Sequence, residues 1–105
     1  MIVTRMLVFL MLTVAALPAL AEGDAQAGQQ KAARCQGCHG AQGIAPVPDY
    51  PNLAGQHAGY LASALRAYQA GTRSGGEAEV MQAFVAGMSE QDIEDIAAWY
   101  AGLRP

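Results

Sequence analysis

The stretch that decides the fold is Cys35-Gln36-Gly37-Cys38-His39, which brings two thiols and an imidazole together within five residues. The pattern Cys-x-x-Cys-His is the covalent attachment signature of a c-type haem. On a helical turn the two thiols lie where they can form thioethers to the two vinyl groups of the porphyrin, and the imidazole points at the iron. The motif therefore predicts one covalently bound haem c, attached through Cys35 and Cys38, with His39 as an axial ligand of the iron.

Three other uses of the two cysteines fit the sequence less well. A structural zinc site needs four ligands, normally from two separated pairs, and only His57 is available as a fourth. A thioredoxin-type redox pair is expected near a βαβ pattern, which the chain does not show. A disulfide between Cys35 and Cys38 would leave His39 without a purpose. Of these four uses of the two cysteines, covalent attachment of haem fits the sequence best.

Residues 1–21 resemble a secretory signal peptide. They carry one charge, Arg5, followed by an apolar run that ends in the small-x-small pattern Ala19-Leu20-Ala21. The run is shorter than the roughly 20 residues that span a bilayer, which makes an uncleaved anchor the less favoured alternative. We expect cleavage before Glu22 and export to the bacterial periplasm, where a single domain formed by residues 22–105 has no stable membrane insertion.

The part of the chain that follows the leader is small and acidic. It is short for a self-sufficient hydrophobic core, so a large buried prosthetic group is expected to complete it. Five Lys and Arg against nine Asp and Glu give it a formal charge of −4, which disfavours nucleic acid as a partner and favours a protein with a basic patch. Two of the five basic residues, Arg66 and Arg73, are either partners of the haem propionates or solvated surface charges.

The spacing of apolar and capping residues predicts an all-α domain of three to five helices. Asp24 is the expected N-cap of the first helix and Ser89 that of the last, which ends near Gly102. The segment 40–55 is rich in glycine and proline, and a loop of that length usually serves a site. The predicted helices are 24–34, 59–70, 77–86 and 89–102.

The sixth ligand of the iron decides the function, because iron with both axial positions filled transfers electrons, whereas an open position binds gases or peroxide. Met81 and Met88 are the two methionines outside the leader. Met88 directly precedes Ser89, where an apolar residue often packs on the fourth residue of the helix, here Ile93. Met81 has no such local role and is the favoured ligand, with Met88 as the alternative. A bis-histidine site with His57 is less favoured.

Taken together, these residues resemble the class I c-type cytochromes, most closely the short bacterial periplasmic monohaem proteins and single lobes of the dihaem ones. The resemblance covers residues 22–105. Besides the haem motif and Gly40, it rests on weaker segments in the same order: Pro51-Asn52-Leu53-Ala54-Gly55-Gln56, Tyr60-Leu61, Gly71-Thr72-Arg73, Ser89-Glu90-Gln91-Asp92-Ile93 and Ala97-Ala98-Trp99-Tyr100-Ala101.

The resemblance implies further roles around the haem. Pro51 would offer its carbonyl to the ring N–H of His39, which fixes the imidazole and raises its basicity toward iron, and Leu53 would pack on the haem. The first and last helices would cross. The family's methionine ligand precedes the C-terminal helix at a spacing that fits Met81 better than Met88. Because Leu or Phe is usual at the position of Met88, exchange between the two methionines stays open.

We therefore expect a periplasmic single-haem electron carrier that cycles between Fe(III) and Fe(II) with His/Met ligation. Its redox protein partners would meet it at a transient, charge-steered interface. The chain shows no nucleophile with its base, no paired carboxylates in a cleft motif and no phosphate-binding glycine loop, so no independent enzyme activity is expected. Two alternatives remain: a haem sensor or peroxidase-like protein with an open or displaceable sixth position, and a permanent cytochrome subunit of a larger oxidoreductase.

Overall fold

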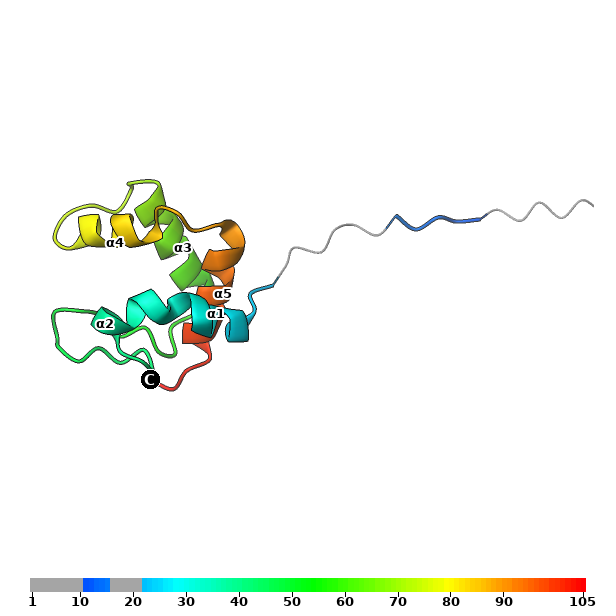
Figure 1. Cartoon of the computed structure of the whole chain (residues 1–105). Helices are drawn as coiled ribbons and strands as arrows, with labels where there is room; N and C mark the ends of the chain where they lie inside the picture. Colours follow the sequence, from blue (N-terminus) through cyan, green and yellow to red (C-terminus); the bar gives the residue numbers. More distant parts are fainter. Residues whose placement is uncertain (1–10, 16–21) are drawn as a thin grey trace, which may run out of the picture.

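The computed structural model describes residues 11–15 and 22–105, and within them all regular structure is helical (Figure 1). The helices are α1 (Ala25–Lys31), α2 (Gln36–His39), α3 (Ala58–Gln69), α4 (Ala78–Val85) and α5 (Glu90–Ala101), with a 3-10 turn, Ala32–Cys35, between α1 and α2. The prediction of an all-α domain is confirmed.

The leader predicted for residues 1–21 lies outside the described residues, apart from residues 11–15. Among the described residues, every helix is too short or too polar to cross a bilayer.

The start of α1 follows the prediction, but its end does not. The side chain of Asp24 accepts hydrogen bonds from the backbone N–H groups of Gln26 (2.9 Å) and Ala27 (3.1 Å), as an N-cap does. The helix predicted for residues 24–34 ends at Lys31, where the chain tightens into the 3-10 turn that leads into α2. Such turns, whose hydrogen bonds join residues three apart, are frequent at helix ends. The haem motif therefore begins at a change of helix type.

α1 crosses α5 at close range, and a glycine makes the approach possible. A Cβ atom at Gly28 would lie 1.9 Å from the carbonyl oxygen of Asp95 and 3.0 Å from the Cβ atom of Trp99, so no larger residue fits there without displacing a helix. The apolar side predicted for α5 faces this core, and its members are buried: Ile93, Ile96, Ala97 and Tyr100.

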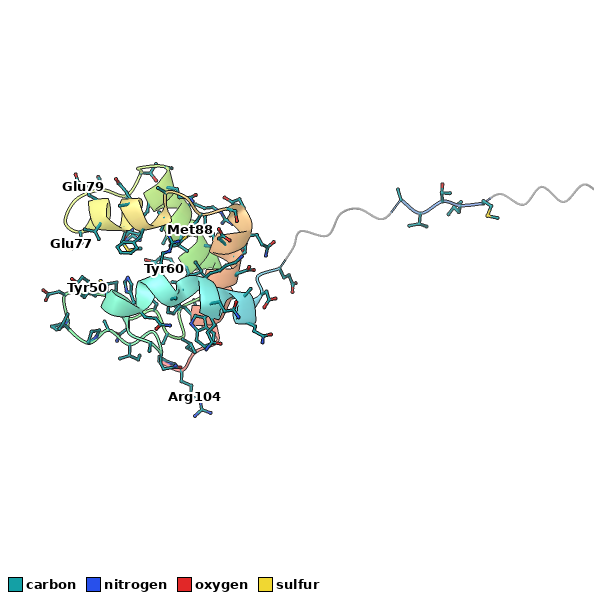
Figure 2. All side chains as sticks on the ribbon, in the orientation of Figure 1. Tyr50, Tyr60, Glu77, Glu79, Met88 and Arg104 are labelled. Atoms are coloured by element: carbon teal, nitrogen blue, oxygen red, sulfur yellow. The ribbon has the colours of Figure 1, made fainter. Side chains whose placement is uncertain are left out.

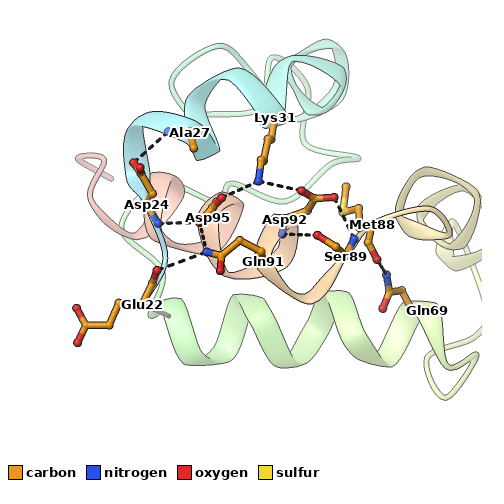
Figure 3. A network of polar contacts seen from close by, with 10 residues as sticks. All are labelled: Glu22, Asp24, Ala27, Lys31, Gln69, Met88, Ser89, Gln91, Asp92 and Asp95. Atoms are coloured by element: carbon orange, nitrogen blue, oxygen red, sulfur yellow. Dashed lines mark hydrogen bonds and ion pairs between the residues drawn. The ribbon is translucent and has the colours of Figure 1, made fainter. Parts of the chain in front are cut away.

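A polar network fastens the start of α1 to α5 (Figure 3). The carboxylate of Asp95, only 2% exposed, accepts from the backbone N–H of Asp24 (2.8 Å), the ammonium group of Lys31 (2.7 Å) and the side-chain amide of Gln91 (2.7 Å). These donors, the N–H of Asp24 foremost, lower the pKa of Asp95 to about 2. Lys31 also pairs with Asp92 at 2.9 Å. The buried charge is thus fully compensated.

The start of α5 is fixed by its own cap and by an ion pair from α3. Ser89 and Asp92 form a reciprocal capping box, with both backbone-to-side-chain distances at 3.0 Å, which confirms Ser89 as the N-cap. The guanidinium of Arg66 on α3 binds the carboxylate of Glu90 at 2.8 Å and that of Glu94. Arg66 therefore joins two helices. It does not line the cavity described below, so the structure does not support Arg66 as a partner of the haem propionates.

Candidate haem-binding site

A cavity of about 490 Å³ lies between α2, the loop that follows it, and helices α3, α4 and α5. Cys35, Cys38 and His39 line it from the motif, and Met81 and Met88 line it from α4 and the turn before α5. In Figure 1, α4 and α2 form opposite arms of the domain, joined by α3 and α5. The structure thus brings both cysteines, the predicted histidine ligand and both candidate methionines to one cavity.

The imidazole of His39 is held by the predicted partner. His39 is 6% exposed, and its Nδ1 atom lies 2.8 Å from the carbonyl oxygen of Pro51. Because a carbonyl can only accept, Nδ1 carries the proton and Nε2 keeps the free lone pair that a metal requires. The ring of Tyr50 stands edge-on to the imidazole, with the ring centroids 6.5 Å apart.

The loop that presents Pro51 is closed by backbone bonds at its base. The carbonyl of Gly43 accepts the N–H groups of both Leu53 (2.8 Å) and Ala54 (3.0 Å), and Gly43 adopts a φ of +74° that favours glycine. Asn52 adds a side-chain bond to the backbone of the same loop. As expected, the segment 40–55 has no helix or strand, yet these contacts define its path, and Leu53 lines the cavity.

Tyr100 gives an independent indication that the cavity holds a prosthetic group. Among the described residues, its hydroxyl is the buried side-chain polar atom without a hydrogen-bond partner. Burial raises its pKa well above the ordinary value, as does the neighbouring Cys35 thiol, and burial also raises the pKa of that thiol. The thiol of Cys35 beside it offers only a weak hydrogen bond, so the hydroxyl keeps the capacity for a further partner. A mainly apolar cavity that also presents two thiols, an oriented imidazole and this hydroxyl fits a covalently attached haem.

The two methionines differ in their packing. Both are half-buried and both line the cavity. The side chain of Met88 packs against the buried core cluster that includes Ile93, in agreement with the local role expected before the cap of α5. Met81 packs against no part of that cluster, so its sulfur is the one less committed to the core.

The other two candidates from the sequence are His57 and Arg73, and only Arg73 lines the cavity. His57 is the exposed N-cap residue of α3 and does not line the cavity, so the geometry does not support a bis-histidine site. Arg73 does line it, with its guanidinium carbon 4.5 Å from the centre of the Tyr68 ring. Among the described residues, there is no group of three or more His, Cys, Asp or Glu side chains that could hold a metal ion.

Several cavity residues were not singled out as site residues from the sequence. The most prominent are Tyr50, Tyr60 and Tyr68, together with Arg34, whose Nη1 atom donates to the carbonyl of Phe84 at 3.2 Å. Figure 2 shows Tyr60 facing the space between the arms, with Tyr50 on the loop side and Glu77 on the α4 side. Their proximity depends on the folding of distant segments, so no local pattern signals it.

A family model for cytochrome c matches residues 25–103. The chain therefore belongs to the cytochrome c family. It is 49% identical over 79 residues to cytochrome c-554(548) of Halomonas halodenitrificans, a match that covers 75% of this chain and 95% of the relative. It is 43% identical over 101 residues to cytochrome c4 of Pseudomonas aeruginosa, which covers 95% of this chain and 49% of the relative.

The solved structures agree with this assignment. The crystal structure of reduced recombinant cytochrome c4 from Pseudomonas stutzeri superposes with a TM-score of 0.69 at 41% identity, over 78% of this chain and 46% of the other. This cytochrome thus spans nearly all of its c-554(548) relative and about half the length of the c4 proteins. The class I fold and a covalently bound haem c are confirmed, and this cytochrome acts in haem-based electron transfer.

Proposed function

We propose that this cytochrome is a periplasmic single-haem electron carrier whose iron is ligated by His39 and Met81. The observation that carries the proposal is the cavity itself, which has an imidazole with its Nε2 free for metal and a methionine not packed into the core. Bound haem supplies the Fe(III)/Fe(II) couple. Cys35 and Cys38 would hold it through thioethers, and His39 and Met81 would ligate its iron.

The surrounding residues set the conditions for electron transfer. The carbonyl of Pro51 orients the histidine ring and increases its basicity. A thioether ligand favours the reduced iron, and the apolar wall, with Leu61 and Ile96 among its members, keeps water from it. Electron transfer requires no residue of the cavity to make or break a covalent bond of a substrate, so we propose a carrier without independent enzyme activity.

The surface around the cavity fits a brief encounter with a redox protein. Tyr60, Val80 and Phe84 line the cavity and are also exposed, which gives a small apolar contact area. Asp49 and Glu77 line it as well and are exposed. Small interfaces suit rapid exchange of redox partners, and the formal charge of −4 on residues 22–105 favours a partner with a basic patch.

The experiment that tests the proposal is the near-infrared spectrum of the oxidised holoprotein. Ligation by methionine gives a charge-transfer band from sulfur to ferric iron. We expect the band in the unaltered protein, its loss in Met81→Ala, and its retention in the matched variant Met88→Leu. A band absent from the unaltered protein contradicts methionine ligation, and a band lost only in Met88→Leu assigns the ligand to Met88 instead.

A further inference from the structure

Side chains that bind backbone carbonyls help to hold α4 beside the cavity. Only Ala78 and Val85 of this helix are buried. Gln69, the last residue of α3, donates from Nε2 to the carbonyl of Val85 (2.9 Å) and to that of Met88 (2.8 Å). The second of these bonds is drawn in Figure 3. The last carbonyls of a helix lack partners within it, so a single amide here fixes the whole turn that joins α4 to α5.

The two carbonyls that Gln69 binds belong to the segment 85–88, which follows Met81 in the chain and ends at Met88. Val85 follows Met81 by four residues and lies on the same face of α4. The bond to its carbonyl holds the end of the helix that carries Met81. The other bond holds the backbone of Met88 itself, whose side chain packs against the core cluster. The N–H of Met88 closes the same turn by donating to the carbonyl of Val85 at 3.1 Å.

We propose that Gln69 selects the sixth ligand: it anchors Met88 in the turn and leaves the iron position to Met81. The inference rests on the proposed function, since it takes a methionine as the sixth ligand. Gln69 is a positioning residue, because it acts through the backbone of the turn and does not line the cavity. Two ordinary hydrogen bonds are enough to change the ratio of two ligation states by about tenfold.

A second glutamine provides a matched control. Gln82 of α4 donates from Nε2 to the carbonyl of Arg73 at 2.9 Å, a contact of the same kind on the segment that precedes α4. Gln82 does not line the cavity and does not touch the turn at Met88. Its removal loosens α4 without releasing Met88, which separates selection of a ligand from general destabilisation.

The experiment compares the near-infrared band of oxidised holoprotein variants. Met81→Ala alone is expected to lose the band, because Gln69 holds Met88 in place. Adding Gln69→Leu is expected to restore it at least about tenfold above the Met81→Ala level. The restored band should disappear when Met88→Leu is added, and adding Gln82→Leu in place of Gln69→Leu should restore nothing.

Each outcome decides between the proposals. If Met81→Ala loses the band and Gln69→Leu does not restore it, or if Gln82→Leu restores it equally, the selecting role of Gln69 is wrong while the proposed ligand stands. If Met81→Ala keeps the band with Gln69 intact, Gln69 does not select, and loss of the band in Met88→Leu alone would also refute Met81 as the ligand.

A single variant keeps the test decisive if the Met81→Ala proteins do not fold. In otherwise unaltered holoprotein, Gln69→Leu should produce a second proton resonance from an iron-bound methionine methyl group. That resonance should vanish with Met88→Leu and should not appear in Gln69→Lys, whose ammonium group can donate to the same carbonyls. One unchanged methionine resonance in Gln69→Leu would overturn the inference.

Discussion

The Nδ1 atom of His39 lies 2.8 Å from the carbonyl oxygen of Pro51, although twelve residues of chain separate them. The bond joins the end of α2 to a loop that has neither helix nor strand. The orientation of the imidazole therefore depends on the path of the loop, and residues that define this path affect the His39 ring without touching it.

Gly43 is one of the residues that define that path, because its carbonyl accepts the N–H groups of Leu53 and Ala54. We expect Gly43→Ala to lower the free energy of unfolding by about 2 kcal/mol or more, because φ is +74° and the new Cβ would lie 2.9 Å from the backbone nitrogen of Ala54. Gly71→Ala is the matched control, since Gly71 has a φ of +72° and no atom within 4 Å, and it should cost only about 1 kcal/mol. Urea unfolding of the holoproteins measures both, and equal losses would contradict the steric argument.

The crossing of α1 and α5 predicts a second contrast between glycines. Gly28→Ala should destabilise the protein by about 3 kcal/mol, because its Cβ would lie 1.9 Å from the carbonyl oxygen of Asp95. Gly59→Ala near the start of α3 meets no atom within 4 Å and should leave stability unchanged or raise it by up to about 0.5 kcal/mol through its greater helix propensity. Thermal unfolding followed by circular dichroism tests the pair. Similar melting temperatures for the two variants would show that the helices can separate freely at this point.

The carboxylate of Asp95 predicts how stability depends on pH. Its pKa falls from 3.8 to about 2 in the folded protein, chiefly through the N–H of Asp24 and the ammonium of Lys31. A lowered pKa means that the contribution to stability is complete above the ordinary value and is lost as the pH falls from about 4 to about 2. The difference in unfolding free energy between the unaltered protein and Asp95→Asn should therefore shrink over this range. A constant difference from pH 7 to pH 2.5 would argue against an ionised Asp95 in the network.

The acidic surface predicts how this cytochrome meets a partner. Electron transfer to a protein with a basic patch should slow as ionic strength rises, because salt screens exposed charges over about 10 Å at 0.1 M. Stopped-flow measurements at increasing salt test this, with an uncharged small-molecule oxidant as the control that should show little dependence. Rates to the protein partner that stay flat with salt would rule out charge steering.

Much of the fold can be predicted from the sequence because its signals are local. Asp24 and Ser89 cap the helices expected of them, and the spacing of Ile93 and Ile96 identifies the buried side of α5. Local signals do not extend to contacts between distant segments, which is why the ion pairs of Arg66 could not be foreseen.

The candidate site likewise combines features that local sequence predicts with features that depend on contacts between distant segments. The motif Cys35–His39 is contiguous, and its attached cofactor can be predicted from five residues. The buried hydroxyl of Tyr100 lies beside Cys35, and Gln69 of α3 binds carbonyls at the end of α4 and before α5, so both features depend on contacts between segments far apart in the chain. In our proposal the choice between Met81 and Met88 depends on the bonds of Gln69, which the spacing along the chain does not reveal.

The measurement that tests the central claim most directly is the addition of carbon monoxide to the reduced holoprotein. If His39 and Met81 both ligate the iron, carbon monoxide should leave the visible spectrum unchanged. Met81→Ala should bind the gas readily because its sixth position is open. Ready binding of carbon monoxide by the unaltered reduced protein would contradict the electron-carrier account and favour a sensor or peroxidase-like function.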